Sequence, residues 1–210
     1  KNSSKVFEYK ITGNSIEKVG EFTTPGRANN LCALGDTLFV ADYENGISIR
    51  KGSEEIQNLK TVAPVSGIKK WKDNFYIGFL VDTRILLLEK NRENKLRILK
   101  EFISPGRTVD YNIFGGNLYV QDIDSGLTVF TNPKNLKEKV YLKNLCGIKN
   151  INVDSLLFAG FDPIKNSMFV YSMQNGIPAQ RIDSVSIKSA FGFIWIHDKM
   201  IYFQCENGLD

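Results

Sequence analysis

Short runs of β-branched and aromatic residues, each closed by a polar turn, alternate along the whole chain. The clearest runs are residues 37–42 and 117–122, and each is followed by a turn cluster that ends in glycine, Gly46 or Gly126. β-branched and aromatic residues favour strands, and glycine at such a point favours a tight hairpin turn. No segment shows a convincing helical period. The pattern therefore predicts an all-β protein.

The two clearest hairpins belong to longer segments that repeat each other. Residues 21–52 and 101–132 lie 80 positions apart and agree at 10 of 32 positions without a gap, including a Pro-Gly-Arg sequence. Weaker copies lie between and after them, with spacings of 37, 43, 38 and 44 residues and a mean of 40.5. The residues that mark the copies are Asp36, Asp73, Gly116, Asp154 and Asp198. A period of about 40 residues is typical of one four-stranded blade of a β-propeller.

The ends of the chain predict the number of blades. Only two residues follow Gly208, so the last blade lacks its two outer strands, and residues 5–22 supply two spare strands. Ring closure removes unpaired sheet edges. We therefore expect one domain, residues 1–210, folded as a five-bladed β-propeller in which the N-terminal strands complete the fifth blade. The blades start near residues 27, 65, 107, 145 and 188. A fragment of a larger propeller is the alternative, because the chain does not begin with Met.

The charge and the apolar runs of the chain argue against two classes of partner, nucleic acids and the membrane interior. The net charge is +4, with 27 basic and 23 acidic residues that interleave. No apolar run approaches the roughly 20 residues that span a bilayer. The densest basic stretch, residues 90–100, fits a solvated outer edge better than a nucleic-acid surface. We expect no membrane span and no nucleic-acid partner.

The three cysteines have no metal-type spacing. Cys32, Cys146 and Cys205 each lie within or at the end of an expected inner strand. Buried free thiols are the favoured interpretation, with one disulfide and a leftover thiol as the alternative. The sequence thus predicts no metal site and no cofactor.

The hairpins at residues 40–49 and 120–133 resemble the LVIVD repeat, in which a strand ending in Asp is followed by a turn and by Gly-Leu or a similar pair. The match is good in blades one and three, partial in blade five and weak in blades two and four. Its Asp and Gly fall on Asp42, Asp122, Gly46, Gly126 and Gly208, whereas Gln204 replaces the Asp in blade five. The resemblance implies a bacterial or archaeal surface or secreted propeller, often a lipoprotein, and so an extracytoplasmic location. The polar residues 1–4 suit a tether to a lipid anchor upstream of Lys1, or an arbitrary chain start.

Loops on one face of such a propeller supply the candidate ligand site. Loops that enter the blades and turns between the second and third strands emerge there together. The ligand-binding candidates are Arg27, Arg107, Asp42, Tyr43, Asp122, Asp124, Phe79 and Phe161, with Glu44, Asp82, Arg84, Asp162, Lys165, Gln204 and Glu206 on the same face. Mixed charge with exposed aromatics suits a glycan, a peptide terminus or an anionic group. The alternative is structural, since an aspartate before a turn glycine often caps the hairpin and a nearby arginine pairs with it.

Catalytic signals are few. His197 is the only histidine, and no serine or cysteine nucleophile motif accompanies it, so we assign no catalytic residue. Asp42, Asp122 and Asp162 are the carboxylates that a channel-facing glycosidase would use. We therefore hypothesise a non-catalytic binding propeller that recognises a protein or glycan. The alternatives are a small carbohydrate-active enzyme and a structural scaffold subunit.

The closure hypothesis predicts the effect of a truncation. Deleting residues 1–20 should abolish the cooperative unfolding transition, because the fifth blade would lose its outer strands. Thermal unfolding followed by circular dichroism measures this. A truncated protein with unchanged thermal stability would contradict the five-blade hypothesis.

Overall fold

The computed structural model describes residues 3–132, 139–187, 190–205 and 208–209. The chain forms two compact units, residues 1–103 and 104–210. Antiparallel strands make up nearly all of the regular structure in the described ranges, as expected for an all-β protein.

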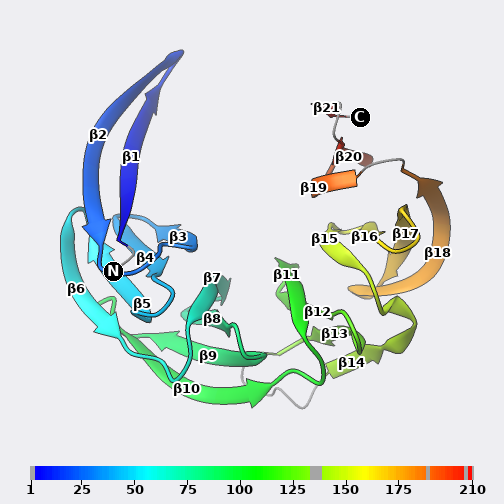
Figure 1. Cartoon of the computed structure of the whole chain (residues 1–210), viewed down its shortest axis with the longest axis horizontal. Coiled ribbons are helices and arrows are strands. Elements are labelled where there is room, and N and C mark those ends of the chain that lie inside the picture. Colours follow the sequence, from blue (N-terminus) through cyan, green and yellow to red (C-terminus); the bar gives the residue numbers. More distant parts are fainter. Residues whose placement is uncertain (1–2, 133–138, 188–189, 206–207, 210) are drawn as a thin grey trace. The chain divides into compact units, whose positions relative to one another are not determined.

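The first unit contains three sheets (Figure 1). A two-stranded ribbon precedes two four-stranded meanders, which we name blade 1 and blade 2. The ribbon is β1 (Ser4–Thr12) and β2 (Ser15–Thr24); blade 1 is β3 (Asn30–Leu34), β4 (Thr37–Ala41), β5 (Ile47–Lys51) and β6 (Glu54–Leu59); blade 2 is β7 (Val65–Lys72), β8 (Phe75–Leu80), β9 (Arg84–Lys90) and β10 (Leu96–Ile103).

The second unit continues the same pattern with blades 3, 4 and 5. Blade 3 is β11 (Thr108–Phe114), β12 (Asn117–Asp122), β13 (Gly126–Phe130) and β14 (Lys139–Leu142), followed by the 3-10 turn η1 (Lys143–Leu145); blade 4 is β15 (Lys149–Val153), β16 (Leu157–Asp162), β17 (Ser167–Gln174) and β18 (Ile177–Ser186); blade 5 is β19 (Ala190–His197), β20 (Met200–Cys205) and β21 (Gly208–Leu209). Within each blade, consecutive strands are antiparallel neighbours.

This strand order is consistent with a five-bladed β-propeller. The first strands of the five blades begin at residues 30, 65, 108, 149 and 190, within four residues of the expected blade starts. Blade 5 has three strands in the described part of the chain rather than the two expected, because Gly208 and Leu209 pair with β20. The prediction of one domain over residues 1–210 stays a prediction. Among the described residues, no helix has the length and apolar character needed to cross a bilayer.

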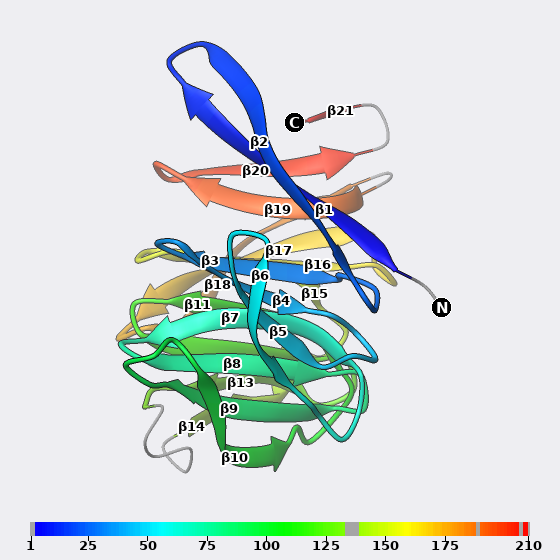
Figure 2. The ribbon, with the colours of Figure 1, turned by 90° about the vertical axis from the view of Figure 1, so that its left-hand side faces the viewer.

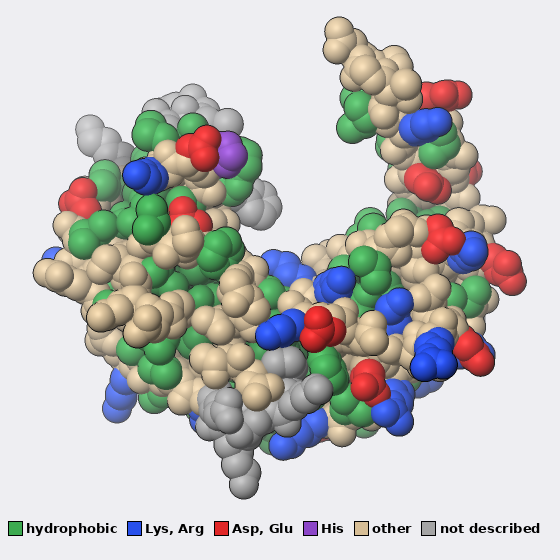
Figure 3. All heavy atoms as spheres, turned by 180° about the vertical axis from the view of Figure 1, so that it is seen from behind, with side chains coloured by type: hydrophobic (Ala, Val, Ile, Leu, Met, Phe, Trp, Pro, Cys, Tyr) green, Lys and Arg blue, Asp and Glu red, His purple; other side chains and the backbone are tan. Residues whose placement is uncertain are grey.

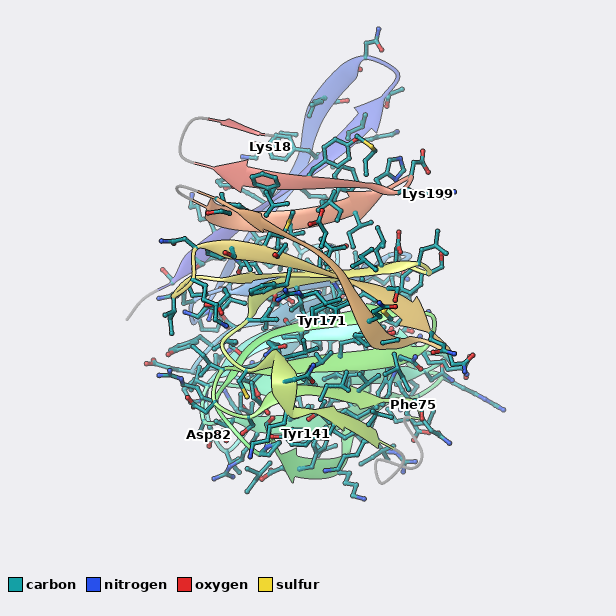
Figure 4. The ribbon with its side chains drawn as sticks, turned by 90° about the vertical axis from the view of Figure 1, so that its right-hand side faces the viewer. Lys18, Phe75, Asp82, Tyr141, Tyr171 and Lys199 are labelled. Atoms are coloured by element: carbon teal, nitrogen blue, oxygen red, sulfur yellow. The ribbon has the colours of Figure 1, made fainter. Side chains whose placement is uncertain are left out.

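Hydrophobic faces of neighbouring blades pack against each other within each unit. In the first unit, Phe39 of blade 1 lies 4.7 Å from Tyr76 of blade 2 between ring centroids, inside a buried cluster shared by both blades. In the second unit, Phe158 and Tyr171 of blade 4 pack with buried side chains of blade 3. Tyr171 is labelled in Figure 4. The core of each unit is thus built between sheets. Every residue of the central strand β8 is buried.

Polar side chains on the innermost strands join successive blades. The Asn30 Oδ1 accepts a hydrogen bond from the backbone N–H of Ile68 at 3.0 Å. Asp110, which is the repeat counterpart of Asn30, accepts one from Ile151 at 2.6 Å, and Asn152 accepts one from Ile196 at 3.3 Å. Each bond satisfies a backbone N–H on the first strand of the next blade.

The ribbon covers part of one face of the blade 1 sheet, over strands β3, β4 and β5. Near blade 1, Val6 and Thr24 are buried and the Arg50 guanidinium lies 4.4 Å from the centre of the Phe22 ring. The far half extends beyond the blade in Figures 1 and 2, and there Ile11 and Ile16 are exposed at 73% and 71%. A hollow of about 290 Å³ lies between the ribbon and strands β3 and β4. A two-stranded ribbon is at best marginally stable alone, so its near half depends on blade 1.

The bond from Ile68 to Asn30 predicts the cost of removing the acceptor. Asn30→Ala leaves the N–H of a fully buried residue without a partner, and we expect it to lower the free energy of unfolding by about 1–3 kcal/mol. Urea unfolding measures the change. Asn14→Ala, in the exposed turn of the ribbon, is the control and should change it by less than about 0.5 kcal/mol. Equal effects of the two variants would contradict the structural role of Asn30.

Candidate functional site

The turn between β4 and β5 carries the first group of candidate residues. It is closed by backbone hydrogen bonds from Asp42 to Gly46 at 2.9 Å and from Asn45 to Asp42 at 2.8 Å. Gly46 has a φ of +88°, and a Cβ there would lie 2.3 Å from the Leu59 carbonyl oxygen. Gly126 repeats both features, with a φ of +104° and the Leu142 oxygen at 2.4 Å. The repeated glycine is therefore required by the turn and by its contact with the outer strand.

Asp42 is fully buried beneath this turn. Its Oδ2 accepts hydrogen bonds from the Gly26 backbone N–H at 3.1 Å and from the Asn45 Nδ2 at 2.9 Å. Its Oδ1 is buried and has no hydrogen-bond partner in the described part of the chain. The carboxylate therefore caps the turn and binds the preceding loop, which is the structural alternative given by the sequence.

Asp122, the counterpart of Asp42 in blade 3, is equally buried but has different partners. The Ser104 Oγ lies 2.7 and 2.6 Å from the two carboxylate oxygens, and the Thr108 Oγ1 donates to Oδ1 at 2.9 Å. Thr24 and Ala28 occupy the matching positions in blade 1. The Thr24 hydroxyl bonds the Gly26 carbonyl instead, at 3.0 Å. The two copies thus share a backbone design and satisfy their carboxylates differently.

Asp162 takes the same position in blade 4. Its Oδ1 accepts hydrogen bonds from the backbone N–H groups of Ile164 and Lys165, at 2.9 and 3.1 Å, and the Lys165 Nζ lies 3.0 Å from Oδ2. Burial acts to raise the pKa of Asp162, but Lys165 and the two backbone donors outweigh it and hold the pKa below its ordinary value. All three candidate carboxylates are thus buried parts of turns.

The Pro-Gly-Arg loop lies directly on the aspartate turn. A Cβ on Gly26 would lie 2.4 Å from the Asp42 carbonyl oxygen, and a Cβ on Gly106 would lie 2.4 Å from the Ser125 Oγ. Glycine therefore permits the close approach of loop and turn. The contact also determines where the next residue, an arginine in both copies, is presented.

Arg27 does not pair with the aspartate, contrary to the structural interpretation of the repeated arginine. Its Nε donates a hydrogen bond to the Asn29 Oδ1 at 2.8 Å, and its guanidinium carbon lies 5.5 Å from the centre of the Tyr43 ring. Asp42 bonds the Gly26 backbone instead. The structure therefore brings Arg27, Asp42 and Tyr43 together in blade 1, with Arg27 exposed and Tyr43 half-buried.

Arg107 is exposed as well, but the residues that hold Arg27 are replaced around it. Val109 stands where Asn29 stands in blade 1, and Ile123 stands where Tyr43 stands. The Arg107 side chain has no hydrogen bond or ion pair with any residue that the structure describes. Asp124, the remaining candidate in blade 3, is exposed at the turn. Blade 3 thus presents a charged turn without a positioned arginine.

The aromatic candidates Phe79 and Phe161 are buried, at 2% and 6% exposure. Their candidacy depended on exposure at the mouth of the ring, so this expectation is corrected. Phe79 pairs with Ile85 across β8 and β9, and Phe161 belongs to a core cluster with Met168 and Ile194. Both side chains are withdrawn from solvent, which a run of apolar residues at a strand end does not reveal.

The remaining loop candidates are mostly exposed, and two of them pair with each other. Asp82 and Arg84 form an ion pair at 3.0 Å, and Arg84 also reaches Glu101 at 3.2 Å. Glu44 and Gln204 are exposed, and Glu206 lies outside the described residues. Basic and acidic side chains also interleave on the face shown in Figure 3. The described surface therefore offers a few specific charges rather than a field of one sign.

His197 and the cysteines show no catalytic arrangement in the described structure. His197 is exposed, stacks on Trp195 and lies 3.5 Å from Asp198. Cys32 and Cys146 are free, partly buried thiols, and burial raises the pKa of Cys32. The side chain of Cys205 lies outside the described residues. No group of His, Cys, Asp and Glu suited to a metal ion is found among the residues searched.

The residues that give the two repeat copies different side-chain partners were not among the candidates from the sequence. Asn29, Ser104 and Thr108 orient Arg27 or satisfy Asp122, and none of them was a candidate. Their only signal is that they lie at positions where the repeats differ in chemistry. The two copies are nevertheless alike in burial. Each residue of 21–30 and of 41–50 is buried, half-buried or exposed like its counterpart in 101–110 or 121–130.

Solved structures of several proteins have a similar fold. A protein from Lactobacillus plantarum matches with a TM-score of 0.71 and 9% identity over 90% of this chain and 67% of its own. Sqt1 from Chaetomium thermophilum matches at 0.66 and 12%, over 88% and 55%. Apo AztD from Citrobacter koseri matches at 0.56 and 18%, over 89% and 58%. These structures are β-propeller-like, and identities this low show the fold alone.

This chain spans little more than half of Sqt1 and AztD and about two thirds of the Lactobacillus plantarum protein. No protein-family model matches the sequence, and no curated protein matches it.

The unpartnered oxygen of Asp42 predicts a stabilising substitution. Ala28→Thr places a hydroxyl where Thr108 bonds Asp122 in the second copy, and we expect it to raise the free energy of unfolding by about 1 kcal/mol. Chemical denaturation measures the gain. Ala28→Val has the same shape without the hydroxyl and should give no gain. A gain that is equal for both variants would show that packing, and not the hydrogen bond, is responsible.

Proposed function

We propose that the protein is a non-catalytic binding propeller that recognises a protein or glycan ligand through the loops of one face. The observation that carries this proposal is the contrast within blade 1. The carboxylate Asp42 is buried and serves the turn, whereas Arg27 is exposed and held by Asn29 and Tyr43. A fixed, exposed arginine suits recognition of a polar ligand. The propeller-like fold is compatible with a binding or scaffold role.

The proposed location is extracytoplasmic, as a surface lipoprotein or secreted protein. Its support is the resemblance of the hairpins at residues 40–49 and 120–133 to the LVIVD repeat. A lipid anchor upstream of Lys1 belongs to the same proposal.

The proposal includes the closure of the ring. Strands β1 and β2 would complete blade 5 beyond its strands β19, β20 and β21. The exposure of Ile11 and Ile16 on the far half of the ribbon supports this, since apolar side chains on a two-stranded ribbon need a further partner.

The burial of the candidate carboxylates weighs against the carbohydrate-active alternative. A glycosidase needs two carboxyl groups that reach the scissile bond. Asp42, Asp122 and Asp162 are 0%, 0% and 3% exposed, and each bonds its own turn or the loop beside it. An enzyme of this type would have to use other carboxylates.

One observation favours a scaffold role as a second candidate. The outer strand β10 exposes Ile98, Leu99 and Ile103, of which Ile103 is 71% exposed. Apolar side chains on an outer edge strand suit docking to another protein by the rim.

Binding assays with matched arginine variants test the proposed function. We expect Arg27→Ala to lower the binding of ligands found on glycan and peptide arrays by about tenfold or more, because a charged hydrogen-bonding partner is lost. Arg107→Ala is the control and should have a smaller effect. If the protein is instead a scaffold that docks by its rim, partner binding should be unaffected by both arginine variants and lost on Ile103→Asp. Hydrolysis of glycans by the purified wild type would overturn the non-catalytic proposal.

A further inference from the structure

Arg27 is held on two sides before any ligand binds. The bond from its Nε to the Asn29 Oδ1 fixes one edge of the guanidinium, and the Tyr43 ring lies against its face. The Tyr43 backbone is fixed beneath the ring, since its carbonyl accepts the N–H groups of Gly46 and Val65. With Nε engaged, the free donors are the terminal groups Nη1 and Nη2, which make no hydrogen bond or ion pair with the described residues. An exposed pair of parallel N–H donors is the arrangement that binds a planar, two-oxygen acceptor.

We infer that Arg27 binds a carboxylate of a polypeptide partner through Nη1 and Nη2, and that blade 1 alone provides this site among the two repeat copies. The inference rests on the proposed function and specifies the ligand chemistry of the same loop face. It assigns the recognised group, which is a terminal or side-chain carboxylate, and the residues Asn29 and Tyr43 that position the arginine.

The surrounding donors favour a carboxylate over a phosphate. Phosphate sites gather several free backbone N–H groups around the anion. Here the N–H groups of Gly26, Asn45 and Gly46 already bond Asp42 or Tyr43. Lys60 is engaged with Asn45, at 2.7 Å, and the exposed Glu44 adds a negative charge to the turn. A single arginine fork next to an acidic turn matches a singly charged planar anion better than a phosphate dianion.

The neighbouring side chains favour a polypeptide over an acidic glycan. Sugar rings stack on free aromatic faces, but the Arg27 guanidinium lies over the Tyr43 ring and Phe79 is buried. The loop next to the turn instead exposes the aliphatic Val62, at 70%, and Val81 is 49% exposed. Backbone bonds from Val65 to Tyr43 and from Val81 to Pro64 tie these loops together. Exposed aliphatic groups on loops tied to the Tyr43 turn suit a peptide with an apolar residue beside its carboxylate.

Blade 3 provides an internal comparison for this site. Arg107 occupies the repeat position of Arg27 with the same exposure class, but Val109 cannot accept a hydrogen bond and Ile123 has no aromatic face. An arginine that is not held loses more side-chain freedom on binding, which weakens the interaction. The difference between the two arginines therefore isolates the effect of positioning.

Nuclear magnetic resonance of the full chain, labelled with 15N, tests the inference at the arginine Nε–H signals. The probes are the peptide acetyl-Gly-Gly-Val as the free acid, its C-terminal amide, acetyl-Gly-Glu-Gly amide, glucuronic acid and inorganic phosphate. We expect the Arg27 signal to shift saturably with the free acid, or with the glutamate peptide if a side chain is the source. The C-terminal amide, which has no carboxylate, should bind at least about tenfold more weakly. The Arg107 signal should not saturate in the same range.

Variants that copy blade 3 into blade 1 separate positioning from simple charge. Asn29→Val and Tyr43→Ile should each weaken the response severalfold, whereas Asn29→Gln keeps an uncharged amide acceptor and should retain more of it. Arg27→Lys should lose the response, because an ammonium cannot form the two-pronged bond, and Arg107→Ala should leave it unchanged. Unchanged backbone amide spectra confirm that each variant is folded.

The outcomes separate this inference from the proposed function. Equal responses of Arg27 to the C-terminal amide and to both carboxylate peptides, or equal responses of Arg27 and Arg107, overturn the inference. A stronger response of Arg27 to phosphate or glucuronic acid overturns the carboxylate assignment while leaving a binding role for blade 1. Array ligands whose binding is unaffected by Arg27→Ala would instead overturn the site on which the proposed function rests.

Discussion

The close contact between a glycine loop and a buried aspartate organises both of the strongest repeats. In blade 1 the backbone N–H of Gly26 bonds the Asp42 carboxylate, and no side chain fits at Gly26 because the Asp42 carbonyl lies too near. A second glycine, Gly46, lets the turn approach the outer strand. These contacts lock the entering loop onto the end of the second strand. The following arginine is consequently presented outward, so the candidate binding group depends on a structural one.

Blades 1 and 3 share the backbone of this loop and turn but differ in the side chains that contact the aspartate and the arginine. Asp122 is satisfied by the hydroxyls of Ser104 and Thr108, whereas one oxygen of Asp42 has no partner in the described structure. Arg27 is held by Asn29 and Tyr43, whereas Arg107 is not held by its counterparts. Blade 3 therefore has the better satisfied turn, and blade 1 has the better positioned arginine. A duplicated element has diverged by a few side chains around a constant set of glycine and aspartate contacts.

Much of the fold follows from local chemistry, and little of the site does. The all-β class and the blade-like strand order agree with the structure, since alternating apolar runs and turn glycines act over a few residues. The expected exposure of Phe79 and Phe161 was wrong. Strands between two packed sheets are buried on both faces, so alternation does not tell which of their aromatic residues reach solvent. The pairing of arginine with aspartate also failed in blade 1, because the Arg27 guanidinium bonds Asn29 and lies over the Tyr43 ring instead.

By itself, the sequence determined where strands and turns lie and that the unit repeats every 40 residues or so, because a positive φ and strand propensity are properties of short segments. The tertiary structure decided which side chains meet across longer separations. The bond from Ile68 to Asn30 spans 38 positions, and the packing of Arg27 on Tyr43 spans 16. Such contacts depend on how sheets stack and loops fold back. For that reason the Pro-Gly-Arg sequence was recognisable as a repeat, but only the fold showed that one of its arginines is held in place.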